Sequence, residues 1–218
     1  MKRMVQRLSA VSLSVCIIVA LCPIGSAQQQ SPDSRRQQTT AAEALRRYEE
    51  QMQATTEPFQ RFYLTTKLAP TALAAGETEK AKAYANSLLQ QAASHRDDWN
   101  CGNAIQVGNL VLGLIALAAD DVPEAKRLLL EAGKSPGSPQ LNSFGPNMLL
   151  AKELLARGER EVVIQYFELC ARFWELEKGR LEEWKAIVIK GGTPKFGANL
   201  MYQLSTWQVE DWGNLGRQ

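Results

Sequence analysis

The sequence predicts an all-α protein, a right-handed stack of antiparallel helical hairpins with about eight or nine helices. Three observations lead to this fold class. From about residue 41 onward, apolar residues recur with helical spacing, and no segment alternates apolar and polar residues as a half-buried strand would. Proline and glycine fall mostly between the apolar stretches. One type of turn sequence also recurs along the chain, as in repeat proteins.

The first 27 residues are predicted to be a secretory signal peptide. Three basic residues lie among the first seven, and the apolar run 11–21 has the length of a signal core but is short for a membrane span. Small residues at 25–27 place cleavage after Ala27. The protein is therefore expected to be exported, to the periplasm or the outside of a bacterial cell, without stable membrane insertion. An uncleaved anchor is the alternative.

Residues 28–40 are polar and hold no large apolar side chain, so they are expected to form a flexible linker. The helical domain then spans 41–218, and about 175 residues are enough for one domain with its own core. Without the three basic signal residues, the 25 lysines and arginines fall to 22 against 23 acidic residues, a net charge of −1. This balance does not favour nucleic acid as a partner, because such proteins carry a clustered basic face.

Three similar turns lie at residues 76–81, 120–125 and 158–163, with spacings of 44 and 38 residues. Aligning the chain on these turns brings a large–small pair into register before each turn, and a small residue followed by a larger apolar one after it. Two helices approach closely only where a side chain is small. The aligned sets are Leu68, Leu112 and Leu150; Ala69, Gly113 and Ala151; Ala81, Ala125 and Val163; and Ala85, Leu129 and Phe167.

This pattern resembles the tetratricopeptide repeat (TPR) over about residues 58–174, and most closely in the second unit. The chain departs from the family in its longer period and in having Thr65, Asn109 and Asn147 where the family has a tryptophan. The resemblance implies a solenoid of hairpins whose first helices line a concave groove. The closest helix approach is expected at Gly113. An irregular helical bundle is the alternative fold.

The elements follow from these turns in order. A first helix at about 41–55 is expected to cap the stack. The turns separate the two helices of each hairpin, and a further helix precedes the Gly-Gly-Thr-Pro sequence at 191–194. A last helix is expected to start near Ala198. Two insertions, 95–101 and 135–143, lengthen the repeats. The expected hairpins are 58–75 with 77–93, 103–119 with 122–133, and 147–157 with 159–175, and the further helix is 180–189.

No catalytic, metal-binding or cofactor-binding motif is present in the sequence, so an enzyme is not expected. The one histidine, His95, lies in a polar loop, and the carboxylates at the turns suit helix starts. A hydrolase with a carboxylate pair on a helical array remains the alternative function. Cys101 and Cys170 are expected to stay unpaired, with Cys170 buried. Among the late aromatic residues, Trp207 and Trp212 are the ones expected to be exposed.

Asparagine is the candidate binding residue. Asn109 and Asn147 occupy the same repeat position at the start of the first hairpin helix, and Asn199 fits that position again if a fourth hairpin begins there. Asn103, like Asn109, directly follows a glycine. An asparagine amide both donates and accepts, which suits the backbone of a bound peptide. We therefore expect a scaffold that binds a peptide or protein partner in its groove, with helix capping as the alternative role for these residues.

Overall fold

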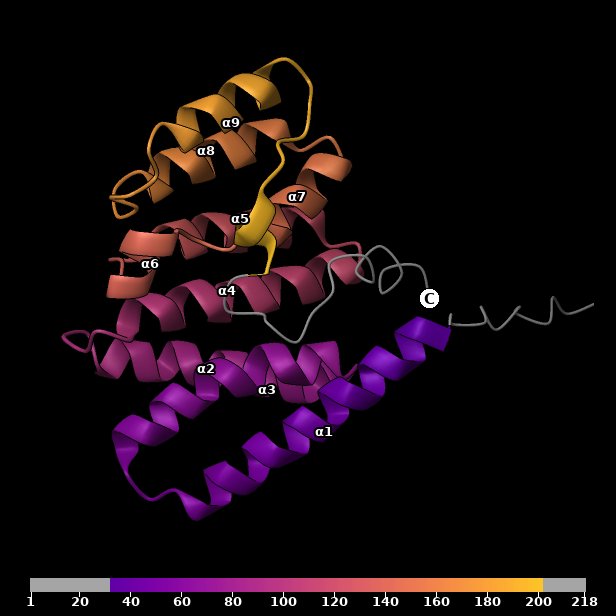
Figure 1. The fold of residues 1–218 in the computed structure, drawn as a ribbon, viewed down its shortest axis with the longest axis vertical. Coiled ribbons are helices and arrows are strands. Elements are labelled where there is room, and N and C mark those ends of the chain that lie inside the picture. Colours follow the sequence, from indigo (N-terminus) through magenta and orange to yellow (C-terminus); the bar gives the residue numbers. More distant parts are fainter. Residues whose placement is uncertain (1–31, 202–218) are drawn as a thin grey trace, which may run out of the picture.

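The computed structural model describes residues 32–201, with side chains from residue 40 onward. This part of the chain is all-helical and contains no strand, which confirms the all-α class (Figure 1). The elements are α1 (Pro32–Ala54), α2 (Pro58–Ala74), α3 (Thr78–Ser94), α4 (Cys101–Ala118), α5 (Val122–Gly133), α6 (Pro139–Phe144), α7 (Leu149–Ala156), α8 (Arg160–Cys170), α9 (Arg180–Ile189) and the 3-10 helix η1 (Gly197–Leu200).

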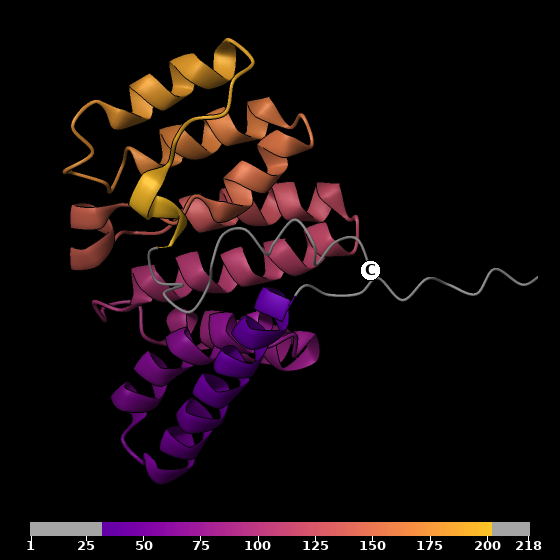
Figure 2. The ribbon, with the colours of Figure 1, turned by 45° about the vertical axis from the view of Figure 1, so that its right-hand side comes forward.

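The helices follow one another along the long axis of the molecule, from α1 at one end to α9 at the other (Figures 1 and 2). Helix α2 packs against α1, α3 and α4, and α3 packs against α4. Helix α4 pairs with α5, which in turn contacts α7 and α8, and α9 covers α8. Most helices therefore pack on neighbours in sequence, whereas α8 packs chiefly on α5.

The three aligned turns have one geometry. Gly76, Asp120 and Gly158 all adopt the left-handed conformation, with φ of 79°, 61° and 86°. Glycine takes this conformation without steric cost, and aspartate is among the few other residues that tolerate it. In each turn the next N–H reaches a carbonyl five residues back, which closes the preceding helix. These bonds are Glu77 N to Ala72 O (2.9 Å), Asp121 N to Ala116 O (2.9 Å) and Glu159 N to Leu154 O (3.0 Å).

Burial at the aligned positions supports the same register. The small residues after the turns, Ala81, Ala125 and Val163, are all 0% exposed. A Cβ atom on Gly113 would overlap the Leu150 side chain, so this position is as crowded as expected. It is not the most crowded glycine, however, because a Cβ on Gly102 would collide with the backbone of the 135–138 connection.

Helix α9 ends at the Gly-Gly-Thr-Pro sequence as expected, and the turn there has the geometry of the three aligned turns. Gly191 has a φ of 85°, and Gly192 N donates to Ile187 O at 3.0 Å. Relative to this turn, Trp184 and Phe196 stand at the two positions that hold small residues in the earlier hairpins. Their rings meet edge to face, with centroids 4.9 Å apart. Two such side chains keep a second helix from packing closely against α9, and the chain continues into η1 instead.

Several helix bounds differ from expectation by one or two residues, the expected last helix near Ala198 is only the 3-10 helix η1, and three differences are larger. The chain is already helical from Pro32, so residues 32–40, expected to be a flexible linker, belong to α1. Arginine and glutamine recur in this stretch and are good helix formers. Part of the 135–143 insertion forms α6, whose start is capped by Ser138. Helix α8 ends at Cys170 rather than 175. The predicted signal peptide and residues 28–31 lie outside the described residues.

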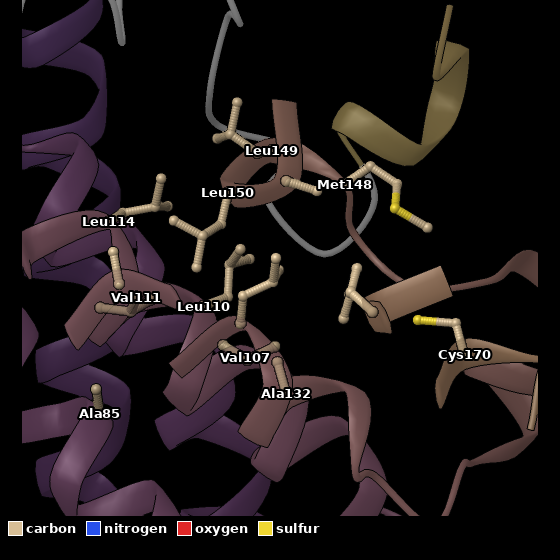
Figure 3. Packing of buried hydrophobic residues seen from close by; sticks show 14 of the residues in the cluster. Ala85, Val107, Leu110, Val111, Leu114, Ala132, Met148, Leu149, Leu150 and Cys170 are labelled. Atoms are coloured by element: carbon tan, nitrogen blue, oxygen red, sulfur yellow. The ribbon is translucent and has the colours of Figure 1, made fainter. Parts of the chain in front are cut away.

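Helix α4 is the centre of the core. Figure 3 shows Leu150 of α7 pointing toward Leu110 and Leu114 of α4, and these three side chains are 0–2% exposed. Among the described residues, α4 alone is long and apolar enough to cross a membrane. Because 78% of it is buried inside the fold, its apolar character is that of a core helix.

Candidate functional site

The four candidate asparagines are buried. Asn103 and Asn109 are each 6% exposed, Asn199 is 3% exposed and Asn147 is 1% exposed. All four amides make hydrogen bonds within the chain. This corrects the expectation that they line an open groove, because a partner cannot reach side chains that the fold has covered.

Asn109 bonds within its own helix. Its Nδ2 donates to the Ile105 carbonyl at 2.8 Å, four residues back in α4. Asparagine inside a helix commonly bonds the local backbone in this way. Asn103 instead joins α4 to the start of α6. Its Nδ2 lies 3.2 Å from Gln140 Oε1, and its Oδ1 accepts a 2.7 Å bond from the Ser138 hydroxyl.

Asn147 and Asn199 fasten the end of the described chain to the start of α7. Asn199 Nδ2 donates to the carbonyls of Phe144 and Pro146, both at 3.0 Å. Asn147 Nδ2 donates to the Leu200 carbonyl at 3.1 Å. The backbone adds a bond of 2.8 Å from the N–H of the residue after Asn147 to the Asn199 carbonyl. The chain therefore leaves η1 at a fixed place.

A second polar group lies deep in the core, between α4 and α8. Tyr166 is fully buried, and its hydroxyl donates to the Asn147 carbonyl at 3.1 Å. Gln106 Nε2 lies 3.5 Å from both oxygens. Burial raises the pKa of Tyr166 well above its usual range, and it also raises the pKa of the Cys170 thiol. These groups therefore stay protonated and do not act as bases or nucleophiles.

The thiols are as expected: Cys101 and Cys170 are free and buried. The Cys101 thiol lies 3.5 Å from the Ala92 carbonyl, which accepts its weak hydrogen bond. Burial also raises the pKa of Cys101. A protonated, covered thiol is a poor nucleophile, so neither cysteine is a catalytic candidate.

The acidic residues at the turns have structural roles. Asp121 caps α5, because its Oδ1 accepts a 3.1 Å bond from Glu124 N. Glu159 pairs with Lys126 at 2.6 Å, and Asp120 pairs with Arg157. Within residues 32–201, no group of three or more His, Cys, Asp or Glu side chains is placed to hold a metal ion.

Three exposed aromatic residues form what we call the aromatic cluster: Phe59, Tyr63 and Trp99. Phe59 and Tyr63 lie one turn apart on α2 and are 46% and 42% exposed. Trp99, 40% exposed, comes from the connection between α3 and α4. Its ring centroid lies 6.0 Å from that of Phe59 and 6.4 Å from that of Tyr63.

The aromatic cluster sits on a well-defined support. The connection that carries Trp99 is closed by a 2.7 Å bond from Asn100 N to Asp98 Oδ1. Beneath it, His95 stacks on the buried Phe62 ring with centroids 5.4 Å apart. The His95 ring thus packs against α2, and the Nδ1 atom lies 2.9 Å from a carbonyl of its own helix. The first contact fixes the connection that carries Trp99, and the second joins the end of α3 to α2, the helix that carries Phe59 and Tyr63.

One cation accompanies the aromatic cluster. The Lys67 ammonium lies 5.4 Å from the centre of the Tyr63 ring, within the range of a cation–π interaction. The surface therefore offers apolar ring area beside a positive charge. Such a surface can bind an apolar side chain and a nearby carboxylate.

The sequence did not reveal the aromatic cluster. Phe59 and Tyr63 follow the helical spacing of a core stripe, so their exposure is decided by how α2 packs. The one available signal for an exposed ring was Trp99 itself, a large aromatic residue in an otherwise polar stretch of sequence. The two tryptophans expected to be exposed, Trp207 and Trp212, lie outside the described residues.

Comparison with known protein families, curated proteins and solved structures finds no match to this chain. The function therefore has to be argued from the chemistry of the aromatic cluster and from the recurring hairpin turns.

Proposed function

We propose that this chain is an exported, TPR-like helical scaffold that binds a partner polypeptide through the aromatic cluster. The observation that carries the proposal is the exposure of three large rings, with Phe59 and Tyr63 both lying beside Trp99. Tyrosine and tryptophan dominate the energetics of protein interfaces, and contiguous exposed apolar patches mark interaction sites. Among the described residues, Phe144 is also exposed, but most of the other large rings are buried in the core, among them Phe62, Tyr166, Phe167, Phe173, Trp174, Trp184 and Phe196.

The TPR-like part of the proposal rests on the recurring turns. The left-handed residues at 76, 120 and 158 close their helices with the same hydrogen bond, and the residues five positions later are all fully buried. A stack of such hairpins provides a rigid frame, and binding residues on a rigid frame lose little entropy when a partner binds.

The partner fitted by this surface is an extended peptide with an aromatic or aliphatic anchor next to a carboxylate. The anchor would pack against the exposed edges and faces of the Tyr63 and Trp99 rings, and the carboxylate would pair with Lys67. The area of three half-exposed rings is small, so we expect a transient complex rather than an obligate one.

A displayed library of random 12-residue peptides tests this proposal. Peptides selected on the chain 28–218 should carry an anchor residue within a few positions of Asp or Glu. Their affinity should fall at least tenfold on Trp99→Ala, which corresponds to about 1.4 kcal/mol or more. Ile189→Ala is the matched control, because Ile189 is 65% exposed but lies at the far end of the molecule on α9.

Lys67→Ala should weaken the same peptides and remove their preference for a carboxylate. Selected peptides that bind Trp99→Ala and Ile189→Ala equally well would refute the aromatic cluster as the binding surface. A library that yields no binder at all would refute the proposal as a whole.

A further inference from the structure

The described chain ends beside the first half of α4, the helix that Trp99 precedes. The Leu200 carbonyl is held by Asn147, whose own carbonyl lies 3.5 Å from Gln106 Nε2 in α4. Gln106 is five residues into α4, and Trp99 immediately precedes that helix. Gln106 and Trp99 therefore differ in position along the helix axis by about 10 Å, at about 1.5 Å per residue. Leu200 therefore lies at the level of the first turns of α4, at the end that carries Trp99.

Seventeen residues, 202–218, follow this fixed point. An extended chain spans about 3.3 Å per residue, so this segment can reach about 55 Å from its origin. The aromatic cluster is well within this distance, even for a segment that is far from fully extended.

The chemistry of this segment matches the partner that the aromatic cluster fits. Residues 207–212 read Trp-Gln-Val-Glu-Asp-Trp, so two aromatic anchors flank a pair of carboxylates. The aromatic cluster offers Tyr63 and Trp99 rings beside the Lys67 ammonium. The two tryptophans of the segment can pack against the rings of the aromatic cluster, and its two carboxylates can pair with the Lys67 ammonium.

We propose that residues 202–218 of the same molecule occupy the aromatic cluster and compete with the partner peptide. This inference rests on the proposed function, because it assigns a regulator to the same surface. A tethered segment acts at an effective concentration in the millimolar range, so even weak docking keeps the surface largely occupied. An external partner then has to displace the segment.

The test uses a fluorescent synthetic peptide of residues 202–218 as the probe. It is titrated into three versions of the chain 28–218: the native sequence, Trp207→Ala with Trp212→Ala, and that pair together with Trp99→Ala. With its own segment disabled, the double variant should bind the probe at least tenfold more tightly than the native chain. Adding Trp99→Ala should abolish the gain. Circular dichroism confirms that each variant remains helical.

Equal affinity of the probe for the native chain and the double variant would overturn the inference. So would a dimer of the native chain that dissociates on Trp207→Ala with Trp212→Ala, because the segment would then act on a second copy. Library peptides separate this failure from failure of the proposed function. If they bind both chains equally but lose affinity on Trp99→Ala, the binding surface stands and self-occupancy is refuted.

Discussion

The hydroxyl of Tyr84 on α3 donates a 2.9 Å hydrogen bond to Glu49 on α1, and Lys80 donates to the same carboxylate at the same distance. Burial, together with the bond to Glu49 and its charge, raises the pKa of Tyr84 to about 12. Burial opposes ionisation of Glu49, but the bonds from Lys80 and Tyr84 outweigh it and lower the pKa of Glu49. The contact therefore joins α1 to the hairpins in a pH-dependent way.

We expect this contact to weaken in alkali. The folded pKa of Tyr84 lies above the unfolded value of about 10, so its stabilisation is complete below pH 10 and is lost as the pH rises toward 12. Tyr84→Phe should therefore flatten the loss of unfolding free energy over this window, as measured by urea titrations at several pH values. In a Glu49→Gln background the substitution should change the profile much less. An unchanged profile for Tyr84→Phe alone would contradict the role given to the hydroxyl.

Gly113→Leu should destabilise the fold. Even a Cβ atom at this position overlaps the Leu150 side chain, and overpacking of a core costs about 1–3 kcal/mol or more. Gly102→Ala should cost more per added atom, because its Cβ meets the Gly137 backbone rather than the end of a flexible side chain. Urea unfolding of the two variants measures both effects, and a Gly113→Leu protein as stable as the native one would mean that α4 and α7 do not pack as described.

The asparagines should differ in their contribution to stability. Asn199→Ala leaves the carbonyls of Phe144 and Pro146 without this donor, and the bond to Pro146 is buried, so the loss should cost about 1–3 kcal/mol for an unsatisfied group. Asn109→Ala removes a bond to a carbonyl of its own helix and should cost less. Equilibrium unfolding measures which of the two variants loses more stability. Hydrogen exchange of the Met148 amide, which donates to the Asn199 carbonyl, should accelerate only in Asn199→Ala.

Thiol reactivity should report global unfolding. Cys101 and Cys170 are both buried and have raised pKa values. The chain 28–218 should therefore react slowly with Ellman's reagent in buffer and release two equivalents in urea. Rapid reaction of Cys170 in the native state would show that α8 opens locally.

Local signals made much of the fold predictable. Each of the turns at Gly76, Asp120 and Gly158 lies within a few residues of the small side chains that pack beside it. The whole pattern of one turn is therefore contained in one short stretch of sequence. Helices α5 and α9 begin and end at the expected residues for this reason. The start of α1 was missed because a polar composition does not by itself prevent a helix.

The candidate site was less predictable, because its residues meet from distant parts of the chain. Asn199 bonds carbonyls more than fifty residues away, and only the folded chain reveals that this amide is used internally. Phe59 and Trp99 are forty residues apart and come together where α2 passes the start of α4. An asparagine column suggested a polar groove, whereas the exposed surface with binding chemistry is aromatic.

The contact between Trp184 and Phe196 bears on self-assembly. If small residues stood at these two positions, another hairpin could pack against the last helix of a repeat array, and a second molecule could provide that hairpin. Contacts of that head-to-tail kind do not close and can grow into filaments. The two large rings fill this site with side chains of the chain itself. At this turn they therefore leave no room for a hairpin of a second molecule against α9.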